Sequence, residues 1–262
     1  MCSRFPSLVL LLLTAVASVA AAAPLRFCAD PENLPFSNRT GQGFDNQIAL
    51  LVAHALHREP VFVWARNGRG FLRERFNRGA CDVLMGVPEH MRGVLATVPY
   101  YRSAYVFVTR AQDHLQIASF DDPHLNGPKI GLQALEENLS PPSLVLIRTG
   151  HAAQLVGFNS FGTHGADILR AVADRRLGTA VVWGPLAGYF TQVDRLPLKL
   201  TPVSPLVDSS GVPLAFSISM AVHPRDPQLR DELNAAIAKW QPQFNRILVR
   251  FNVPTLPPEE AR

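Results

Sequence analysis

The sequence predicts an α/β protein of two lobes, each a mainly parallel sheet flanked by helices, with two crossover strands as the hinge. Three observations support this fold class. Apolar runs of strand length alternate with segments of helical periodicity, this alternation occurs twice, and a long segment of strand character follows each unit. Strands that alternate with helices pair in parallel through right-handed crossovers, so each unit is expected to build its own sheet.

Residues 24–108 are expected to form the main part of the first lobe. Its predicted strands are 24–30, 60–65 and 81–86, its predicted helices are 43–59 and 70–80, and its exit strand is 101–110. In the first of these helices, Ile48, Val52 and Ala55 recur at helical spacing and form an apolar face. The run 81–86 is short and apolar, as in a buried parallel strand.

Residues 109–212 are expected to form the second lobe, and residues 213–255 return to the first. The predicted elements of the second lobe are strands at 129–133, 144–148 and 178–184 and a helix at 165–176. The returning segment is expected to hold a strand at 213–223 and one or two closing helices within 226–251. Because one strand runs from the first lobe to the second and another runs back, a cleft is expected between the two lobes.

The N-terminal residues 1–22 have the features of a signal peptide. Arg4 supplies a positive charge, a short apolar core follows, and small residues end the segment. The apolar core is too short for a membrane span. We therefore expect an exported, periplasmic protein without a membrane span.

Export changes the meaning of the cysteines. Cys2 leaves with the signal peptide, so Cys28 and Cys81 stay in an oxidising compartment. We expect one disulfide between them, and the alternative is two unrelated buried thiols.

Composition and spacing weaken several classes of function. The net charge is only +4, and basic residues are scattered among acidic ones, so a nucleic-acid site is not indicated. Of the eight histidines, only His54 and His57 lie at helical spacing, and no carboxylate joins them as a metal site would require. No cofactor or metal of the protein's own is expected.

An enzyme is also not expected. Glu136 and Glu137 are adjacent, so on a helix they point about 100° apart and form no acid and base pair. Asp30, Glu89 and His90 lie near the expected cleft and leave an enzyme as an open alternative.

The expected cleft follows from the strand order, because ligands bind beyond the carboxyl ends of the strands in such sheets. The residues predicted to line it follow those strand ends or lie near the lobe connection: Asp30, Asn33, Phe36, Ser37, Phe71, Gly86, Val87, Pro88, Tyr100, Tyr101, Gln133, Trp183, Gly184, Pro185 and Tyr189. The aromatic members indicate a cleft for a hydrophobic ligand or for a peptide segment of a partner. The alternative is that half or more of the aromatic residues belong to the cores of the lobes.

Four segments carry a family resemblance: "CADPENLPFSN", "GACDVLMGVP", "PYYRSAYVFV" and "WGPLAGYF". Over nearly the whole mature chain, the sequence resembles the type II periplasmic solute-binding proteins of ABC transporters. More closely, it resembles their J-component subfamily, encoded beside quinoprotein methanol and alcohol dehydrogenases. The resemblance implies a periplasmic partner of a pyrroloquinoline quinone (PQQ)-dependent dehydrogenase, or of its cytochrome, that assists maturation or activation. The alternative is transporter-linked capture of a small solute other than an amino acid.

The chain resembles amino-acid receptors, but it differs from them at the positions where their residues pair with the charged groups of the ligand. The arginine that grips the ligand carboxylate falls on His90, and Arg92 is two residues away. The acidic residue that holds the ligand ammonium falls on Gly184. In the second lobe, Glu136 and Glu137 stand where receptors have hydroxyl residues. We therefore expect no micromolar binding of standard amino acids.

Overall fold

The computed structural model describes residues 23–66, 68, 71–134, 140–160 and 162–259. The expected signal peptide, residues 1–22, lies outside the described residues. Within the described part of the chain, no helix is both long enough and apolar enough to cross a membrane.

The first lobe is built on three parallel strands. β1 (Leu25–Ala29) lies between β4 (Pro60–Trp64) and β5 (Val83–Pro88). Helix α1 (Phe44–Ala55) follows β1 in the chain and packs against the long C-terminal helix α5 (Pro227–Arg250). The structure confirms the three strands and the first helix expected for this unit.

The second lobe repeats the arrangement. β8 (Ile130–Ala134) lies between two parallel neighbours, β9 (Leu155–Asn159) and β10 (Thr179–Trp183). Helix α3 (Asp167–Ala173) packs against β8 and β10, and helix α2 (Pro141–Arg148) lies between β8 and β9 in the chain.

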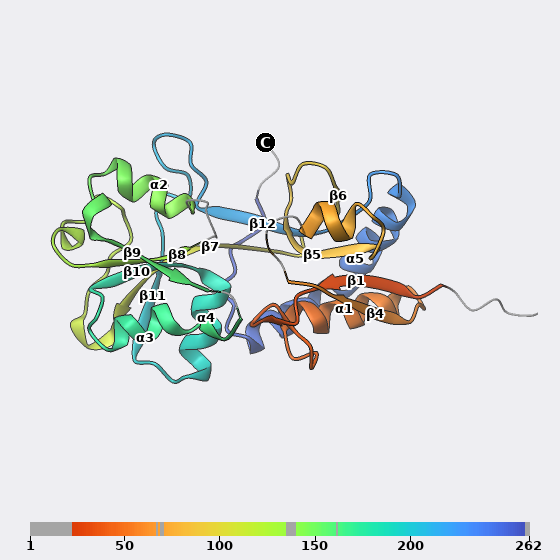
Figure 1. Ribbon diagram of the computed structural model, residues 1–262, viewed down its shortest axis with the longest axis horizontal. Helices are drawn as coiled ribbons and strands as arrows, with labels where there is room; N and C mark the ends of the chain where they lie inside the picture. Colours follow the sequence, from red (N-terminus) through yellow and green to blue (C-terminus); the bar gives the residue numbers. More distant parts are fainter. Residues whose placement is uncertain (1–22, 67, 69–70, 135–139, 161, 260–262) are drawn as a thin grey trace, which may run out of the picture.

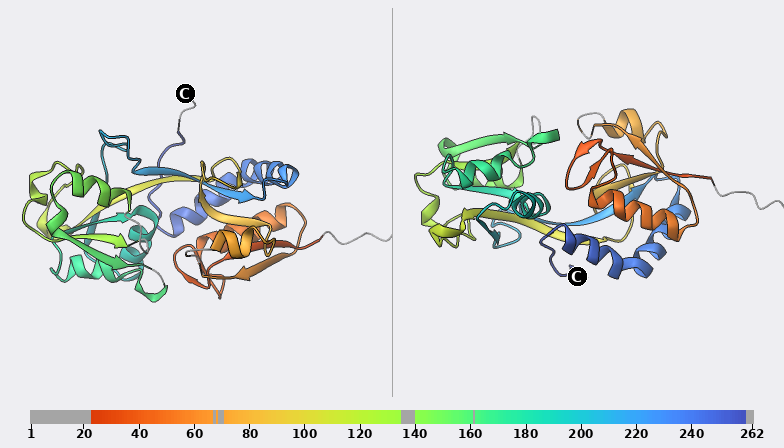
Figure 2. Two further views of the ribbon diagram at one scale, coloured as in Figure 1. Left: turned by 45° about the horizontal axis from the view of Figure 1, so that its top comes forward. Right: turned by 90° about the horizontal axis from the view of Figure 1, so that it is seen from below.

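Two long strands join the lobes into one continuous sheet. β7 (Tyr101–Arg110) pairs with β12 (Ala215–Val222) through its first half and with β10 through its second half. The full strand order is β4-β1-β5-β12-β7-β10-β8-β9. Figure 1 shows β7 and β12 running side by side between the lobes, and the two views in Figure 2 show the same division. The two-lobed α/β fold with two crossover strands is confirmed.

Smaller elements complete the fold. The short strands are β2 (Glu32–Asn33), β3 (Ser37–Asn38), β6 (Leu95–Ala96) and β11 (Leu198–Pro202). A helix, α4 (Gly184–Val193), follows β10, and single helical turns cover Leu72–Phe76, Ala111–Asp113, Pro123–Leu125, Ala152–Gln154 and Gly162–His164.

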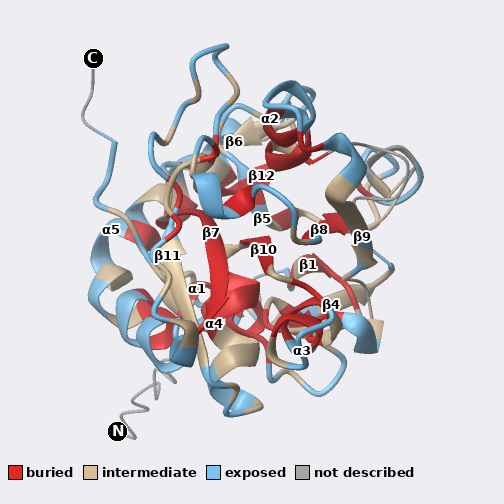
Figure 3. Cartoon of the chain, turned by 90° about the vertical axis from the view of Figure 1, so that its left-hand side faces the viewer, coloured by how far each residue is buried: buried red, intermediate tan, exposed pale blue. Residues whose placement is uncertain are grey.

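Each lobe has its own apolar core. In the first lobe, Ile48 of α1 and Leu233 of α5 are completely buried in one cluster. In the second lobe, Val108, Ile168 and Val182 are buried in another cluster. In Figure 3, β7 and much of the neighbouring helix α4 are coloured as buried.

Two sequence expectations were wrong. Residues 144–148 were expected to be a strand but belong to α2, and the third parallel strand of the second lobe is β9 instead. Gly184 was expected to end the strand at 178–184, but β10 ends at Trp183 and α4 begins directly at Gly184, with Pro185 in its first turn. Pro fits this position because the first helical N–H groups have no partner within the helix.

Two further expectations are refined. Within 70–80, helical structure covers residues 71–76, while residue 70 lies outside the described residues. The segment 226–251 holds one helix, α5, which contains Pro242.

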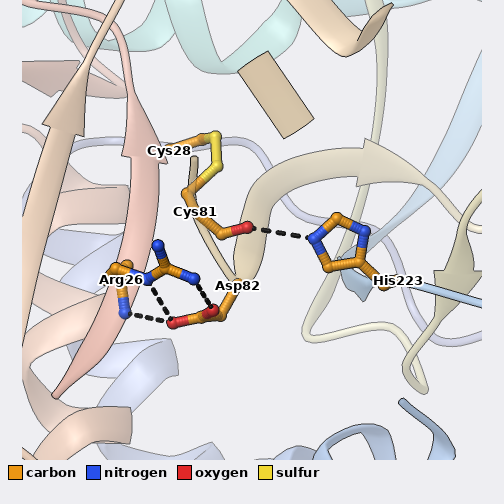
Figure 4. The surroundings of a disulfide bond; sticks show 5 residues. All are labelled: Arg26, Cys28, Cys81, Asp82 and His223. Atoms are coloured by element: carbon orange, nitrogen blue, oxygen red, sulfur yellow. Dashed lines mark hydrogen bonds and ion pairs between the residues drawn. A yellow bond between two sulfur atoms is a disulfide. The ribbon is translucent and has the colours of Figure 1, made fainter. Parts of the chain in front are cut away.

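A disulfide joins Cys28 of β1 to Cys81, which precedes β5. Figure 4 shows it beside a bidentate ion pair, in which Arg26 Nη2 donates to Asp82 Oδ1 at 2.6 Å and Nε donates to Oδ2 at 3.1 Å. Burial opposes ionisation of Asp82, but the hydrogen bonds and charge of Arg26 outweigh it and hold the pKa of Asp82 below its usual range. The expected disulfide is confirmed, and it ties two neighbouring strands of the first lobe together.

Candidate functional site

A cavity of about 970 Å³ lies between the two lobes. Its walls include residues at or beyond the carboxyl ends of four parallel strands, namely Asp30 after β1, Val87 in β5, Gln133 in β8 and Trp183 in β10. Open α/β sheets bind ligands at the carboxyl ends of their strands, and the volume of the cavity suits a small molecule or a side chain of a partner.

Most of the residues predicted for the cleft line this cavity. They are Asp30, Asn33, Phe36, Ser37, Phe71, Gly86, Val87, Pro88, Tyr101, Gln133 and Trp183. The walls are largely apolar, since Phe62, Met85, Met91 and Phe216 also contribute.

Four residues predicted for the cleft lie elsewhere: Tyr100, Gly184, Pro185 and Tyr189 are outside the cavity lining. Helix α4 begins at Gly184 and carries the last three residues away from the cavity, while Leu186 of the same helix lines it. Tyr189 stacks on Phe251, with ring centroids 5.6 Å apart.

The aromatic residues divide between cavity and core. Phe36, Phe71, Tyr101 and Trp183 line the cavity. Phe44 and Tyr100 are fully buried in the core of the first lobe, while Tyr189 packs against that core and Phe190 against a core of the second lobe. Half of these aromatic residues therefore line the cavity, and the other half pack in or against the cores of the lobes.

Trp183 contacts both the crossover strands β7 and β12 and the strand β8 of the second lobe. Its ring packs edge-on against Tyr105 of β7 and Phe216 of β12, with centroids 5.4 and 5.9 Å away. Its backbone N–H donates to Gln133 Oε1 at 2.5 Å, which fixes the Gln133 amide at the cavity wall. Trp183, Tyr105 and Phe216 form one aromatic wall, which we call the Trp183 wall.

Asp45 is a buried carboxyl in the cavity lining, in the first turn of α1. Tyr100 Oη donates to Asp45 Oδ1 at 2.7 Å and accepts from the Gly86 backbone N–H at 3.1 Å. Burial raises the pKa of Asp45 to about 7, although the Tyr100 hydrogen bond opposes the rise. Burial and the neighbouring Asp45 raise the pKa of Tyr100 well above its usual value.

The described residues that line the cavity include two charged side chains, Asp30 and Asp45, and both are acidic. His90 and Arg92 are exposed and lie outside the lining. Glu136 and Glu137 fall outside the described residues. Within the described chain, no three histidine, cysteine or acidic residues gather as a metal ion would need.

Comparison with known proteins places the chain in a family, although no protein-family model matches it. Protein MoxJ of Methylorubrum extorquens is 31% identical over 253 residues, covering 90% of this chain and 83% of MoxJ. The chain belongs to the MoxJ family.

Solved structures agree with the MoxJ assignment. The crystal structure of MxaJ from Methlophaga aminisulfidivorans has a TM-score of 0.79 at 29% identity and covers 88% of this chain and 100% of MxaJ. The periplasmic binding protein XoxJ from Methylobacterium extorquens has a TM-score of 0.74 at 31% identity, covering 89% of this chain and 100% of XoxJ. An ancestral amino acid-binding protein, AncCDT-1, shares the fold alone, with a TM-score of 0.62 at 19% identity. This MoxJ-family chain therefore has the two-lobed fold of periplasmic binding proteins.

Sequence reasoning missed several cavity residues of this MoxJ-family protein. Asp45 lies at the start of a helix and not at the end of a strand, and Tyr105 and Phe216 lie within the crossover strands. For Asp45 a signal existed, because the helix after a strand in an α/β unit begins at the carboxyl edge of the sheet.

Proposed function

We propose that this protein is a periplasmic accessory protein of a PQQ-dependent methanol or alcohol dehydrogenase. In this proposal, residues 1–22 are removed on export, and the mature chain binds the dehydrogenase or its cytochrome through the cleft. Its role is in maturation or activation of the dehydrogenase, and it works as a binding protein rather than as an enzyme. Residues 24–108 with 213–255, and residues 109–212, are the two lobes that form the binding surface.

The observation that carries the proposal is a binding-protein cavity without the charges of an amino-acid receptor. The position of the receptor arginine falls on the exposed His90, and that of the receptor carboxylate falls on Gly184, which is outside the cavity. The described residues of the lining offer no cationic partner for the carboxylate of an amino acid, and a buried charge left unpaired costs about 2–5 kcal/mol of affinity. Membership of the MoxJ family supports a partner within the methanol oxidation system, as the resemblance implies.

The surface of the cavity suits a peptide segment. Its walls are mainly aromatic and aliphatic, and the polar residues among them include Asn33, Ser37 and Gln133. Aromatic side chains bury apolar area, and isolated polar groups fix the orientation of what binds.

PQQ belongs to the partner in this proposal. PQQ is a polycarboxylate, and the charged groups in the described cavity lining, Asp30 and Asp45, are both acidic. Like charges in a partly buried site repel one another, so the cavity does not fit PQQ itself.

Affinity capture from the periplasm of the source organism tests the proposal. The tagged mature chain is expected to recover the dehydrogenase or its cytochrome, identified by mass spectrometry. Trp183→Ala is expected to lower the recovery at least about tenfold, because a buried aromatic anchor dominates such interfaces. Trp64→Ala is the matched control, since Trp64 lies on β4 outside the cavity lining.

Two outcomes would contradict the proposal. If neither dehydrogenase nor cytochrome is recovered, the accessory role is wrong. If Trp183→Ala recovers the partner as well as Trp64→Ala does, the cleft is not the working surface.

The second candidate is an ABC-transporter binding protein for a small solute other than an amino acid. The volume of the cavity, about 970 Å³, favours it. A small molecule that copurifies with the chain, with no protein partner, would support this second function.

A further inference from the structure

The Asp45 carboxyl is an unusual group for an apolar cavity. The residue is 5% exposed and lines the cavity beside Phe36 and Tyr101. Its Oδ1 accepts from Tyr100, whereas Oδ2 has no hydrogen-bond partner among the described residues. A buried carboxylate oxygen without a partner is costly, so a cationic group that reached it would gain a strong partner.

The surroundings of Asp45 suit a cation. Its backbone N–H donates to the Phe36 carbonyl, so the Phe36 ring and the carboxyl are held together at the start of α1. Across the cavity stands the Trp183 wall, whose three rings all line the site. Aromatic faces attract ammonium and guanidinium groups, and they also cover aliphatic carbon.

No described basic side chain already fills this role. Tyr100 and Tyr101 at the start of β7 are the titratable groups that face the carboxyl, and both have a pKa raised well above the usual value by burial and by Asp45. Asp30 adds a second acidic group to the lining. The basic residues of α5 nearest to α1, Arg246 and Arg250, line a separate groove with Gln47, which helical spacing places on the opposite face of α1.

We propose that the cleft contains a subsite for one organic cation, in which the Asp45 carboxylate pairs with an ammonium or guanidinium group and aromatic side chains cover its apolar body. The subsite specifies part of what the proposed function would bind, and it rests on one part of that function, namely that the cleft is the binding surface. Two sources carry this chemistry: a lysine or arginine side chain in an apolar segment of the partner, and a free aliphatic or aromatic amine.

The affinity of the subsite depends on pH in a predictable direction. Because the pKa of Asp45 is about 7 in the empty cavity, the carboxyl is mostly protonated at pH 6 and mostly ionised at pH 8. A cation binds the ionised form, so its affinity is expected to rise about tenfold from pH 6 to pH 8. An alcohol of the same shape is expected to show no such rise.

Calorimetry with three matched probes tests the subsite on the mature chain. The probes are 4-phenylbutylamine, 4-phenylbutanol and 4-phenylbutyrate, which share a phenylpropyl body and end in an aminomethyl, a hydroxymethyl and a carboxylate group. At pH 8 the amine is expected to bind at least about tenfold more tightly than the alcohol, and the carboxylate more weakly than the alcohol.

Two conservative variants locate the effect. Asp45→Asn keeps the shape and can still accept the Tyr100 hydrogen bond, and it is expected to remove both the preference for the amine and its dependence on pH. Asp121→Asn removes an exposed carboxyl outside the cavity lining and is expected to keep both. If wild type binds amine and alcohol equally at pH 8, or if Asp45→Asn keeps the preference, the Asp45 subsite is wrong.

A pair of peptides distinguishes the two sources. Short apolar peptides that carry one central lysine or, in its place, norleucine are titrated in the same way. Tighter binding of the lysine peptide supports a side chain of the partner as the source, and amine binding without it supports a free amine. If neither the amine nor the lysine peptide exceeds its neutral control, the subsite is overturned.

The result is separable from the proposed function. If the chain captures the dehydrogenase but shows no preference for cations, the accessory role stands and the Asp45 subsite fails. If the chain binds amines through Asp45 but captures neither dehydrogenase nor cytochrome, the subsite stands and the accessory role fails.

Discussion

At the scale of one residue, Gly184, the position expected to correspond to the acidic residue of amino-acid receptors, has no room for a side chain. A Cβ atom at this position would lie 2.6 Å from the Ala104 carbonyl oxygen, 2.8 Å from Pro254 Cγ and 2.9 Å from Ser103 Oγ. Backbone and a rigid proline ring cannot give way by these amounts. An acidic side chain is therefore sterically excluded here, as well as being absent from the sequence.

We predict that Gly184→Ala destabilises the protein by about 1–3 kcal/mol, because the added methyl group overpacks this contact. The matched control is Gly157→Ala in β9, where the nearest heavy atom to an added Cβ is 3.8 Å away. The control is expected to change the free energy of unfolding by less than about 0.5 kcal/mol. Denaturant unfolding of both variants measures the difference. Equal stabilities would contradict the close approach of Gly184 to Ala104, Pro254 and Ser103.

At the scale of elements, the sequence pattern predicted the strands that follow simple alternation and failed where a short apolar run is ambiguous. Residues 144–148 read as a strand, yet Ser140 and the two prolines after it begin helix α2, and Leu144 and Ile147 are 42% exposed. A short apolar run cannot by itself distinguish a helix from a strand. Strand β9 was missed because it alternates weakly around Gly157.

The residues of the candidate site were likewise predictable only in part. Residues at strand ends, such as Asp30 and Trp183, were predictable because parallel strands end at one edge of the sheet. Tyr105 and Phe216 lie within the crossover strands, and which of their faces meets the cavity depends on the twist of the sheet. Tyr100 and Tyr101 are adjacent and both are buried in the core of the first lobe, yet only Tyr101 also lines the cavity, because successive side chains of an extended chain point to opposite sides.

The disulfide gives a prediction for the β1–β5 pair. Cys28 and Cys81 are 53 residues apart, so removing the bond frees a long loop in the unfolded chain. We predict that the double variant Cys28→Ala/Cys81→Ala loses about 4 kcal/mol of stability on the chain-entropy model. Wild type unfolded with a reductant is the control and should show the same loss, whereas an unchanged free energy of unfolding in reductant would contradict the prediction.

At the scale of the whole molecule, the segment after α5 fastens the lobes to each other. We call residues 251–256 the C-terminal strap. Asn252 Nδ2 donates to the Gly188 carbonyl of α4 at 3.0 Å, and Ser103 Oγ of β7 donates to the Pro254 carbonyl at 2.6 Å. The Leu256 N–H donates to the Arg102 carbonyl at 2.8 Å, and its side chain packs against the core of the second lobe.

The strap restricts motion between the lobes, because it starts on a helix of the first lobe and ends on the second. Gly188 approaches the strap so closely that a Cβ there would lie 1.9 Å from the Asn252 carbonyl oxygen. Rotation of one lobe against the other is expected to break this packing together with the Asn252–Gly188 hydrogen bond. We therefore expect the strap to hold the cavity largely preformed, which would lower the ordering cost of binding.

We predict that a chain ending at Phe251 has more mobile lobes. Loss of the strap removes buried apolar contacts and three hydrogen bonds, so we expect a loss of about 3 kcal/mol and a fall in Tm of about 6–12 °C. Small-angle scattering should show a larger radius of gyration, and hydrogen exchange should quicken in α4 and in the first half of β7. A chain ending at Pro257 is the control, because it keeps the strap and loses the exposed Arg102–Glu259 ion pair, which is worth at most about 1 kcal/mol. If the two truncated chains scatter and exchange alike, the lobes are held by β7 and β12 alone and the strap has no part in their placement.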